Sequence, residues 1–235
     1  MAMRAASVED KKLLGKYYTP MPLAQDMAEW AIRNYSSKIF DPCFGECALL
    51  IASLHVLMKY NIANAGRLLF GVDIDNEKTK NLVHLLQSGA LKENFVIADF
   101  LSLRPAIVPG APFDVILSNP PFVRHHYITE EKLATAKFAM SELGLKVPGT
   151  AGYWVYFLMH SLRFLKVGGR LAMILPRAFL QADYSIPIRR YIKEKFDRTE
   201  INVINGRWFP DAQEATVILF AEGYQEEKNA VDGRT

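Results

Sequence analysis

The chain has 235 residues, of which 50% are hydrophobic and 23% charged, and this predicts one globular domain with a sizeable core. No apolar run reaches membrane-spanning length and the polar N-terminus carries no signal-peptide pattern, so we expect a cytoplasmic protein without a membrane partner. The net charge of +3 permits nucleic-acid binding but does not argue for it. The two cysteines, Cys43 and Cys47, complete neither a zinc site nor a disulfide framework, and we expect no metal.

The first motif in the chain is Tyr-Tyr-Thr-Pro at residues 17–20. The amphipathic stretch that follows, from Leu23 to Tyr35, predicts a helix. Two interpretations of the segment are equally compatible with the residues. It is either a loop that tethers the helix or a loop laid over a ligand pocket. We take residues 1–36 as an N-terminal segment that carries this loop.

Three predicted strands follow, at 38–41, 67–73 and 94–99, and each ends in an acidic residue. These residues are Asp41, Asp73 and Asp99. A helix is expected at 76–88, between the second strand and the third. In nucleotide-binding folds an acid at the tip of the second strand binds a ribose diol, and the neighbouring Ile74 can lie against an adenine ring. An acid after the third strand can accept a hydrogen bond from the amino group of that adenine.

The turn after the first strand, Pro-Cys-Phe-Gly-Glu-Cys, precedes an apolar helix at 48–58. Such a turn lets a ligand approach the backbone N–H groups at a helix N-terminus. The glycine pattern is incomplete, because only Gly45 is present and Cys47 stands where a second glycine is usual. A side chain there would weaken ligand binding if the position needs a positive φ.

The fourth strand, 113–117, ends in Ser-Asn-Pro-Pro-Phe at 118–122. Each proline fixes its own φ and has no N–H, and the first one keeps Asn119 out of the α region. This predicts a stiff corner at the carboxyl end of a strand, where open α/β sheets bind ligands. The Asn119 amide oxygen and a backbone carbonyl can hold an exocyclic amino group while the Phe122 ring stacks on its heterocycle. The alternative is a stiff loop with Phe122 in the core.

The rest of the chain completes an α/β pattern. A long connection at 123–150, rich in basic and aromatic residues such as Arg124, suits a phosphate backbone. An aromatic helix at 153–165 is expected to end at Gly168–Gly169, followed by a strand at 170–176 and a helix at 185–195. Two last strands, 201–204 and 215–220, predict a doubly wound sheet of seven strands with an antiparallel edge hairpin. We expect the catalytic domain to span 37–222 and a disordered tail 223–235.

Together these motifs resemble the S-adenosylmethionine-dependent N6-adenine DNA methyltransferases, in the motif order of the gamma group. The resemblance runs from Tyr17 to about Phe220 and is carried by Tyr-Tyr-Thr-Pro, Asp-Pro-Cys-Phe-Gly, Val-Asp-Ile-Asp, Ala-Asp-Phe, Ser-Asn-Pro-Pro-Phe, Gly-Gly-Arg-Leu-Ala-Met-Ile-Leu-Pro and Trp-Phe-Pro. It implies the Rossmann-like fold of class I methyltransferases, S-adenosylmethionine as cofactor, and methyl transfer to the N6 amino group of an adenine flipped out of DNA. It also implies the modification component of a restriction-modification system.

The resemblance assigns two sets of residues. The residues that would bind the cofactor are Tyr18, Thr19, Asp41, Gly45, Asp73, Ile74, Asp99, Phe100 and Asn119. Those that would hold the target are the catalytic motif Asn119, Pro120, Pro121 and Phe122, with Phe157 near the transferred methyl group, Phe209 as a second aromatic clamp, and Arg124. In the motif, Asn119 and the Pro120 carbonyl would accept from the target amino group.

Members of this group carry a target-recognition domain after the catalytic one, whereas only residues 221–235 follow the last predicted strand here. We therefore expect either a partner subunit that reads the DNA sequence, an excised domain, or a promiscuous enzyme. Three other functions stay open: an RNA amino-methyltransferase, a protein-glutamine methyltransferase, and a cofactor-binding subunit without catalysis.

Overall fold

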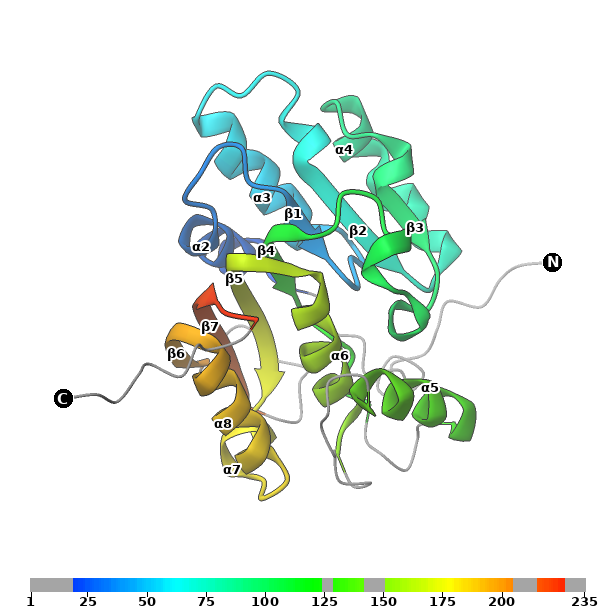
Figure 1. Ribbon diagram of the computed structural model, residues 1–235. Helices are drawn as coiled ribbons and strands as arrows, with labels where there is room; N and C mark the ends of the chain where they lie inside the picture. Colours follow the sequence, from blue (N-terminus) through cyan, green and yellow to red (C-terminus); the bar gives the residue numbers. More distant parts are fainter. Residues whose placement is uncertain (1–18, 124–128, 142–150, 205–214, 227–235) are drawn as a thin grey trace.

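The computed structural model describes residues 19–123, 129–141, 151–204 and 215–226 (Figure 1). Within them one seven-stranded sheet has the order β3-β2-β1-β4-β5-β7-β6. The strands are β1 Ile39–Asp41, β2 Leu69–Asp73, β3 Phe95–Ile97, β4 Phe113–Ser118, β5 Leu165–Pro176, β6 Phe196–Ile204 and β7 Thr216–Tyr224. β1 to β5 are parallel, and β7 runs antiparallel to both β5 and β6. The predicted doubly wound sheet with an antiparallel edge pair is confirmed.

Helices cover both faces of the sheet (Figure 1). One face carries α2 Met21–Ala31, α3 Ala48–Lys59 and α4 Val83–Gln87, and the other carries α5 Glu130–Ser141, α6 Tyr153–Ser161, α7 Ala178–Gln181 and α8 Ser185–Lys195. Successive strand residues point to opposite faces, so Ile39 packs in the first layer and Phe40 in the second. Because both faces are buried, the central strands are continuous apolar runs. No helix in the described ranges is both long enough and apolar enough to span a membrane.

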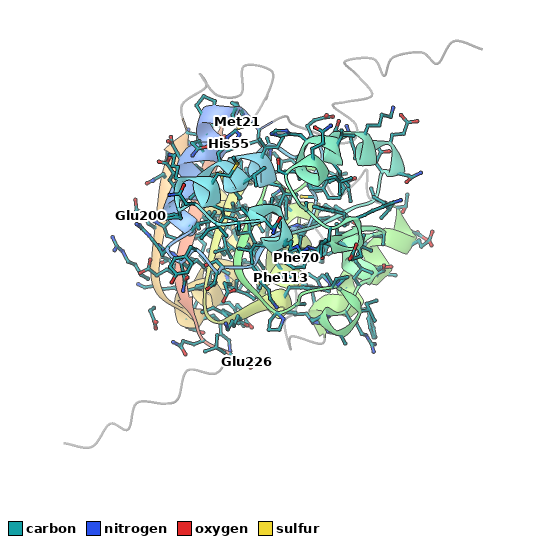
Figure 2. All side chains as sticks on the ribbon, turned by 90° about the horizontal axis from the view of Figure 1, so that it is seen from above. Met21, His55, Phe70, Phe113, Glu200 and Glu226 are labelled. Atoms are coloured by element: carbon teal, nitrogen blue, oxygen red, sulfur yellow. The ribbon has the colours of Figure 1, made fainter. Side chains whose placement is uncertain are left out.

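Aromatic rings fill the layer beneath the central strands. Phe40 on β1 stacks on Phe113 of β4 with ring centroids 4.4 Å apart, and Phe113 also contacts Phe70 of β2 at 5.2 Å. Figure 2 shows Phe70 and Phe113 next to each other inside the molecule, while Glu200 and Glu226 lie at its periphery. Each buried ring contributes about 1.5–3 kcal/mol to stability. These contacts hold β2, β1 and β4 side by side, which fixes where their carboxyl ends lie.

Three elements between residues 76 and 141 differ from those expected. The helix expected at 76–88 is a 3-10 helix, Asn76–Leu82, that leads into the short α4. There the Asn81 amide donates to the carbonyl of Gly45 at 3.2 Å, which ties the segment to the loop after β1. β3 ends at Ile97, so Asp99 begins a 3-10 turn instead of ending the strand. α5, inside the connection that we expected to be irregular, was not predicted.

The second half of the chain needs two further corrections. The aromatic helix ends at Ser161 and a 3-10 turn, and the glycine pair expected to end it lies inside β5. The register between β4 and β5 is irregular there, and Gly168 has φ +79°, as glycine in a bulge commonly does. β7 continues to Tyr224, whose ring packs on Phe196 at 5.3 Å, so the strand runs past the end expected at residue 220.

Candidate active site at the carboxyl ends of the strands

The strand order brings most of the candidate residues to one edge of the sheet. β1 pairs in parallel with β2 on one side and with β4 on the other. Carboxyl ends of adjacent parallel strands meet at the same edge. Asp41, Asp73 and Asn119 therefore converge, and Asp99 follows the next strand, β3.

The loop after β1 is held in place by its own backbone N–H groups. The Cys43 N–H donates to Oδ1 of Asp41 at 3.1 Å, and the Phe44 N–H donates to the carbonyl of Val72 at 3.1 Å. The Gly45 N–H donates to Oδ2 of Asp73 at 2.8 Å. Gly45 has φ +47°, a conformation that glycine adopts without strain. The loop thus lies across the tip of β2.

Asp73 is a preorganised acceptor. Besides the bond from Gly45 to Oδ2, its Oδ1 accepts from the Asp75 N–H at 2.9 Å. A carboxylate oxygen has two lone pairs, so both oxygens can accept further bonds from hydroxyl groups. Beside it, the Ile74 side chain is 56% exposed. A carboxylate next to an exposed apolar side chain fits a ribose and the base attached to it.

Asp41 differs sharply from Asp73, because it is only 2% exposed. Burial raises the pKa of the Asp41 carboxyl to about 8; the hydrogen bond from Cys43 opposes this rise and the negative charge of Asp73 adds to it. A cationic group beside Asp41 would favour the ionised carboxylate. This environment fits an ammonium group of a ligand.

Asp99 caps the 3-10 turn that follows β3, where its Oδ1 accepts from the Leu101 N–H at 3.0 Å. The two aromatic rings predicted to contact the cofactor and the methyl group, those of Phe100 and Phe157, are buried in the core. Phe100 is 2% exposed and Phe157 is 6% exposed, and their ring centroids are 5.5 Å apart in the core. They offer a ligand very little surface in this conformation, so their contact with a cofactor or methyl group stays a prediction.

The corner after β4 meets the Tyr-Tyr-Thr-Pro segment. The Asn119 amide nitrogen, Nδ2, donates to Oγ1 of Thr19 at 3.0 Å, across 100 residues of sequence. Thr19 is 7% exposed, and the next residue, Pro20, is the N-cap of α2. In this orientation the amide nitrogen of Asn119 donates to Thr19, and the amide oxygen is the atom that can accept hydrogen bonds from a ligand. Thr19, which with Pro20 is the described part of the Tyr-Tyr-Thr-Pro segment, thus contacts the corner directly.

Pro120 is buried, and Pro121 and Phe122 are partly buried. Phe122 packs against the core clusters on both faces of the sheet and retains exposed surface. Both interpretations of Phe122 therefore hold in part. Three further candidates, Tyr18, Arg124 and Phe209, lie outside the described residues.

Cys47 occupies the conformation that a glycine would favour, with φ +63° and ψ +14°. Its side chain is fully buried in the cluster beneath α2 and α3, and burial raises the pKa of its thiol to about 12. The side chain therefore points into the core and not into ligand space. The backbone at this position carries strain, but the thiol does not block the loop.

The structure adds site residues that the sequence did not indicate. The thiol of Cys43 lies 3.1 Å from Oγ of Ser118, and Tyr153 lies close enough to Asp99 that burial and the Asp99 charge both raise its pKa. Ser118 stands inside the motif that was singled out, so its position was a usable signal. Tyr153 was one of several aromatic residues in a core helix, and nothing in the sequence distinguished it.

A separate depression of about 380 Å³ lies between the 3-10 turn after β3 and α5, with Arg104, Phe138 and Arg163 in its lining. None of the candidate residues lines it, so we base the site on the hydrogen bonds at the strand ends. In the parts of the chain that the structure describes, no three His, Cys, Asp or Glu side chains gather as metal ligands would.

Comparisons with known proteins found relatives of this chain. A sequence model of the N-6 DNA Methylase family matches residues 1–231. The Type II methyltransferase M.AccI of Acinetobacter calcoaceticus is 25% identical over 226 residues, which cover 93% of this chain and 38% of that protein.

Two solved structures have the same fold. A modification subunit of a putative type I restriction enzyme from Vibrio vulnificus YJ016 superposes with a TM-score of 0.71 at 22% identity, over 89% of this chain and 45% of that one. A putative class I S-adenosylmethionine-dependent methyltransferase from Listeria monocytogenes gives 0.68 at 17% identity, over 93% and 64%. The expected class I methyltransferase fold is confirmed.

The chain spans only 32 to 44% of the length of the curated relatives it matches. The family match itself covers nearly all of the sequence, including every strand and every candidate residue described above. The chain belongs to the N-6 DNA Methylase family.

Proposed function

We propose that this chain transfers a methyl group from S-adenosylmethionine to the N6 amino group of adenine in DNA, as the modification component of a restriction-modification system. The observation that carries the proposal is the position of Asn119, at the end of β4, hydrogen-bonded to Thr19 and adjacent to the loop after β1. The similarity to a Type II methyltransferase and to a modification subunit supports the choice of DNA.

The residues at the strand ends fit the cofactor. Asp73 presents a carboxylate already aligned by two backbone N–H groups, beside the exposed Ile74, for the ribose and the adenine. The buried Asp41 suits the amino group of the methionine part. Asp99 would accept from the adenine amino group. Gly45, with its positive φ, lets a ligand come close to the backbone.

The bound cofactor supplies an activated methyl group on a sulfonium. The chain supplies positioning and electrostatic stabilisation. The amino nitrogen of adenine is a poor nucleophile because its lone pair is delocalised into the ring. The Asn119 amide oxygen and the Pro120 carbonyl would each accept a hydrogen bond from one N–H of the adenine amino group. These two hydrogen bonds would favour a tetrahedral amino nitrogen, whose lone pair can attack the methyl group. The transfer would leave S-adenosylhomocysteine and a methylated amino nitrogen that releases one proton to solvent, so the scheme needs no general base to activate the amino group.

The target adenine is buried in duplex DNA, so it must be flipped out of the stack. Phe122, partly exposed beside Asn119, would stack on the flipped base, and Phe209 would be the second clamp. Stacking on an aromatic ring contributes about 1–3 kcal/mol per base. Because the chain spans a fraction of its relatives' length, we propose that a specificity subunit or a target-recognition region outside this sequence reads the DNA.

One incubation tests the proposal against its rivals. The protein is mixed with methyl-labelled S-adenosylmethionine and a pool of unmethylated DNA, RNA and protein extract, and the pool is then fractionated. We expect label in DNA, recovered as N6-methyladenine. Label in the RNA or in glutamine side chains would overturn the choice of substrate. Cofactor binding by calorimetry without any transfer, also in the presence of a specificity subunit, would identify a non-catalytic subunit.

A further inference from the structure

The thiol of Cys43 joins the two halves of the candidate site. Cys43 lies in the loop after β1, and its Sγ is 3.1 Å from Oγ of Ser118 and 3.4 Å from the carbonyl oxygen of Asn119. These residues lie 75 and 76 positions further along the chain. The backbone N–H of Cys43 bonds Asp41, so this one residue contacts both the cofactor side and the catalytic side.

The corner after β4 depends on such a contact more than an ordinary turn does. Pro120 and Pro121 have no backbone N–H, so the corner cannot anchor itself through donors at these positions. A donor that reaches the Asn119 carbonyl fixes the plane of the Asn119–Pro120 peptide. That plane in turn sets the direction of the Pro120 carbonyl and of the Asn119 side chain.

The number of protons available on Cys43 and Ser118 assigns a donor and an acceptor to each of these two hydrogen bonds. The thiol donates its one proton to the Asn119 carbonyl, and the sulfur accepts the hydroxyl proton of Ser118. Ser118 is fully buried, so its hydroxyl would lose free energy without this acceptor. Burial, followed by the charge of Asp41, raises the pKa of the Cys43 thiol well above its ordinary value, which keeps the donor proton in place.

We propose that Cys43 is a positioning residue, whose thiol holds the Asn119–Pro120 peptide in the orientation that the target amino group requires. This inference rests on the proposed function for its catalytic consequence, but the contact itself does not. The competing explanation is that Cys43 is simply a small side chain that fills space beside the core.

Two substitutions separate these explanations. Cys43→Ala keeps a small side chain and removes the donor, whereas Cys43→Ser restores a donor. With DNA as substrate, we expect Cys43→Ala to lower kcat about three- to tenfold, the effect of one lost hydrogen bond, and to leave the KM for S-adenosylmethionine within about twofold. Cys43→Ser should recover most of the loss. Ser53→Ala, which removes a buried side-chain donor to the Leu49 carbonyl inside α3, is the matched control and should leave kcat unchanged.

A second readout needs no activity. Asn119–Pro120 is the single Asn-Pro pair in the sequence. Carbonyl-13C asparagine combined with 15N proline therefore gives one signal in a carbon-detected correlation spectrum. The Asn119 carbonyl resonance should move upfield in Cys43→Ala and return towards the wild-type position in Cys43→Ser, because carbonyl shifts follow hydrogen bonding.

The two readouts keep this inference apart from the proposed function. If the wild-type protein methylates no DNA, also in the presence of a specificity subunit, but the carbonyl resonance responds as expected, the function is wrong and the contact stands. If the resonance does not move in Cys43→Ala, or if kcat stays within twofold of wild type, Cys43 has no positioning role. An equal loss of kcat in the alanine and serine variants would also overturn it, since only packing would then matter.

Discussion

The loop after β1 and the corner after β4 are neighbours at the same edge of the sheet, but they are held in opposite ways. The β1 loop uses its own backbone donors, from Cys43 and Gly45, to reach Asp41 and Asp73. The β4 corner lacks backbone donors at both prolines and is held by side-chain contacts, from Thr19 and Cys43, to Asn119. We call the first loop self-supporting because its own backbone N–H groups hold it, although the Asn81 amide also donates to the Gly45 carbonyl. The corner is supported from outside, by side chains of other segments.

Under the proposed function, this difference would separate binding from catalysis. Asp41 and Asp73, which the loop contacts, would accept hydrogen bonds from the cofactor, so their substitution should change affinity. The corner would accept hydrogen bonds from the reacting amino group, so substitution of its supports, Thr19 and Cys43, should change turnover and leave affinity alone. Each prediction below tests one side of this division.

Asn119→Ala should have the largest effect. Removing one of two acceptors for the target amino group should lower kcat about 100- to 1,000-fold, by analogy with removing one electrostatic contact to a transition state. Cofactor affinity, measured by calorimetry, should stay within about threefold. Asn94→Ala is a control, because Asn94 is a buried amide that bonds Arg67 and Leu69 carbonyls away from the site. Unchanged turnover in Asn119→Ala would exclude the corner from catalysis.

Asp41 should make stability depend on pH. Its ordinary pKa is 3.8 and its folded value about 8, so between these the folded state keeps a proton that the unfolded state has lost. The contribution of this group to stability is therefore largest below pH 4 and falls as the pH rises towards 8, by up to about 1.4 kcal/mol per pH unit. Urea unfolding at pH 6 and pH 8 should show a steeper loss for wild type than for Asp41→Asn. Parallel losses would mean that Asp41 ionises normally.

Asp73→Ala tests the self-supporting loop. It removes the acceptor for two backbone N–H groups and the proposed ribose ligand. We expect S-adenosylmethionine affinity to fall about 10- to 100-fold, the effect of losing hydrogen bonds to a charged group. The matched control is Asp114→Ala, because Asp114 also accepts a backbone N–H, from Lys38 at 2.9 Å, but lies at the amino end of β4. Equal cofactor affinity in Asp73→Ala and wild type would remove Asp73 from the ribose site.

The positions of the candidate residues could be predicted from the sequence, whereas the contacts that support the β4 corner could not. Asp41, Asp73 and the Ser-Asn-Pro-Pro-Phe corner each follow an apolar run, so their position at strand ends followed from local pattern. The contacts of Asn119 with Thr19 and Cys43 join residues 100 and 76 positions apart. The pairing of β1 with β4 brings Cys43 to Asn119, and the packing of α2 on the sheet brings Thr19 there, so no local sequence pattern could predict either contact.

The element errors have local causes of the same kind. β6 begins at Phe196, five residues before the strand predicted at 201–204. The charged residues 197 and 198 near its start are not typical of a strand. That segment is a strand because it pairs along its length with β7, from Phe196 opposite Tyr224 onwards. Pairing partners at a sheet edge tolerate polar side chains, so the alternation that usually identifies a strand was weak.

Thr19 gives the smallest effect and the most direct test of support from outside. Thr19→Val keeps the shape of this nearly buried side chain and removes the hydroxyl that accepts from Asn119. We expect kcat to fall about three- to tenfold, and Thr19→Ser to restore it. If Thr19 acts through Asn119, the double variant Thr19→Val with Asn119→Ala should lose no more turnover than Asn119→Ala alone. Additive losses would show that Thr19 acts on the cofactor independently, and the β4 corner would then need Cys43 as its main support.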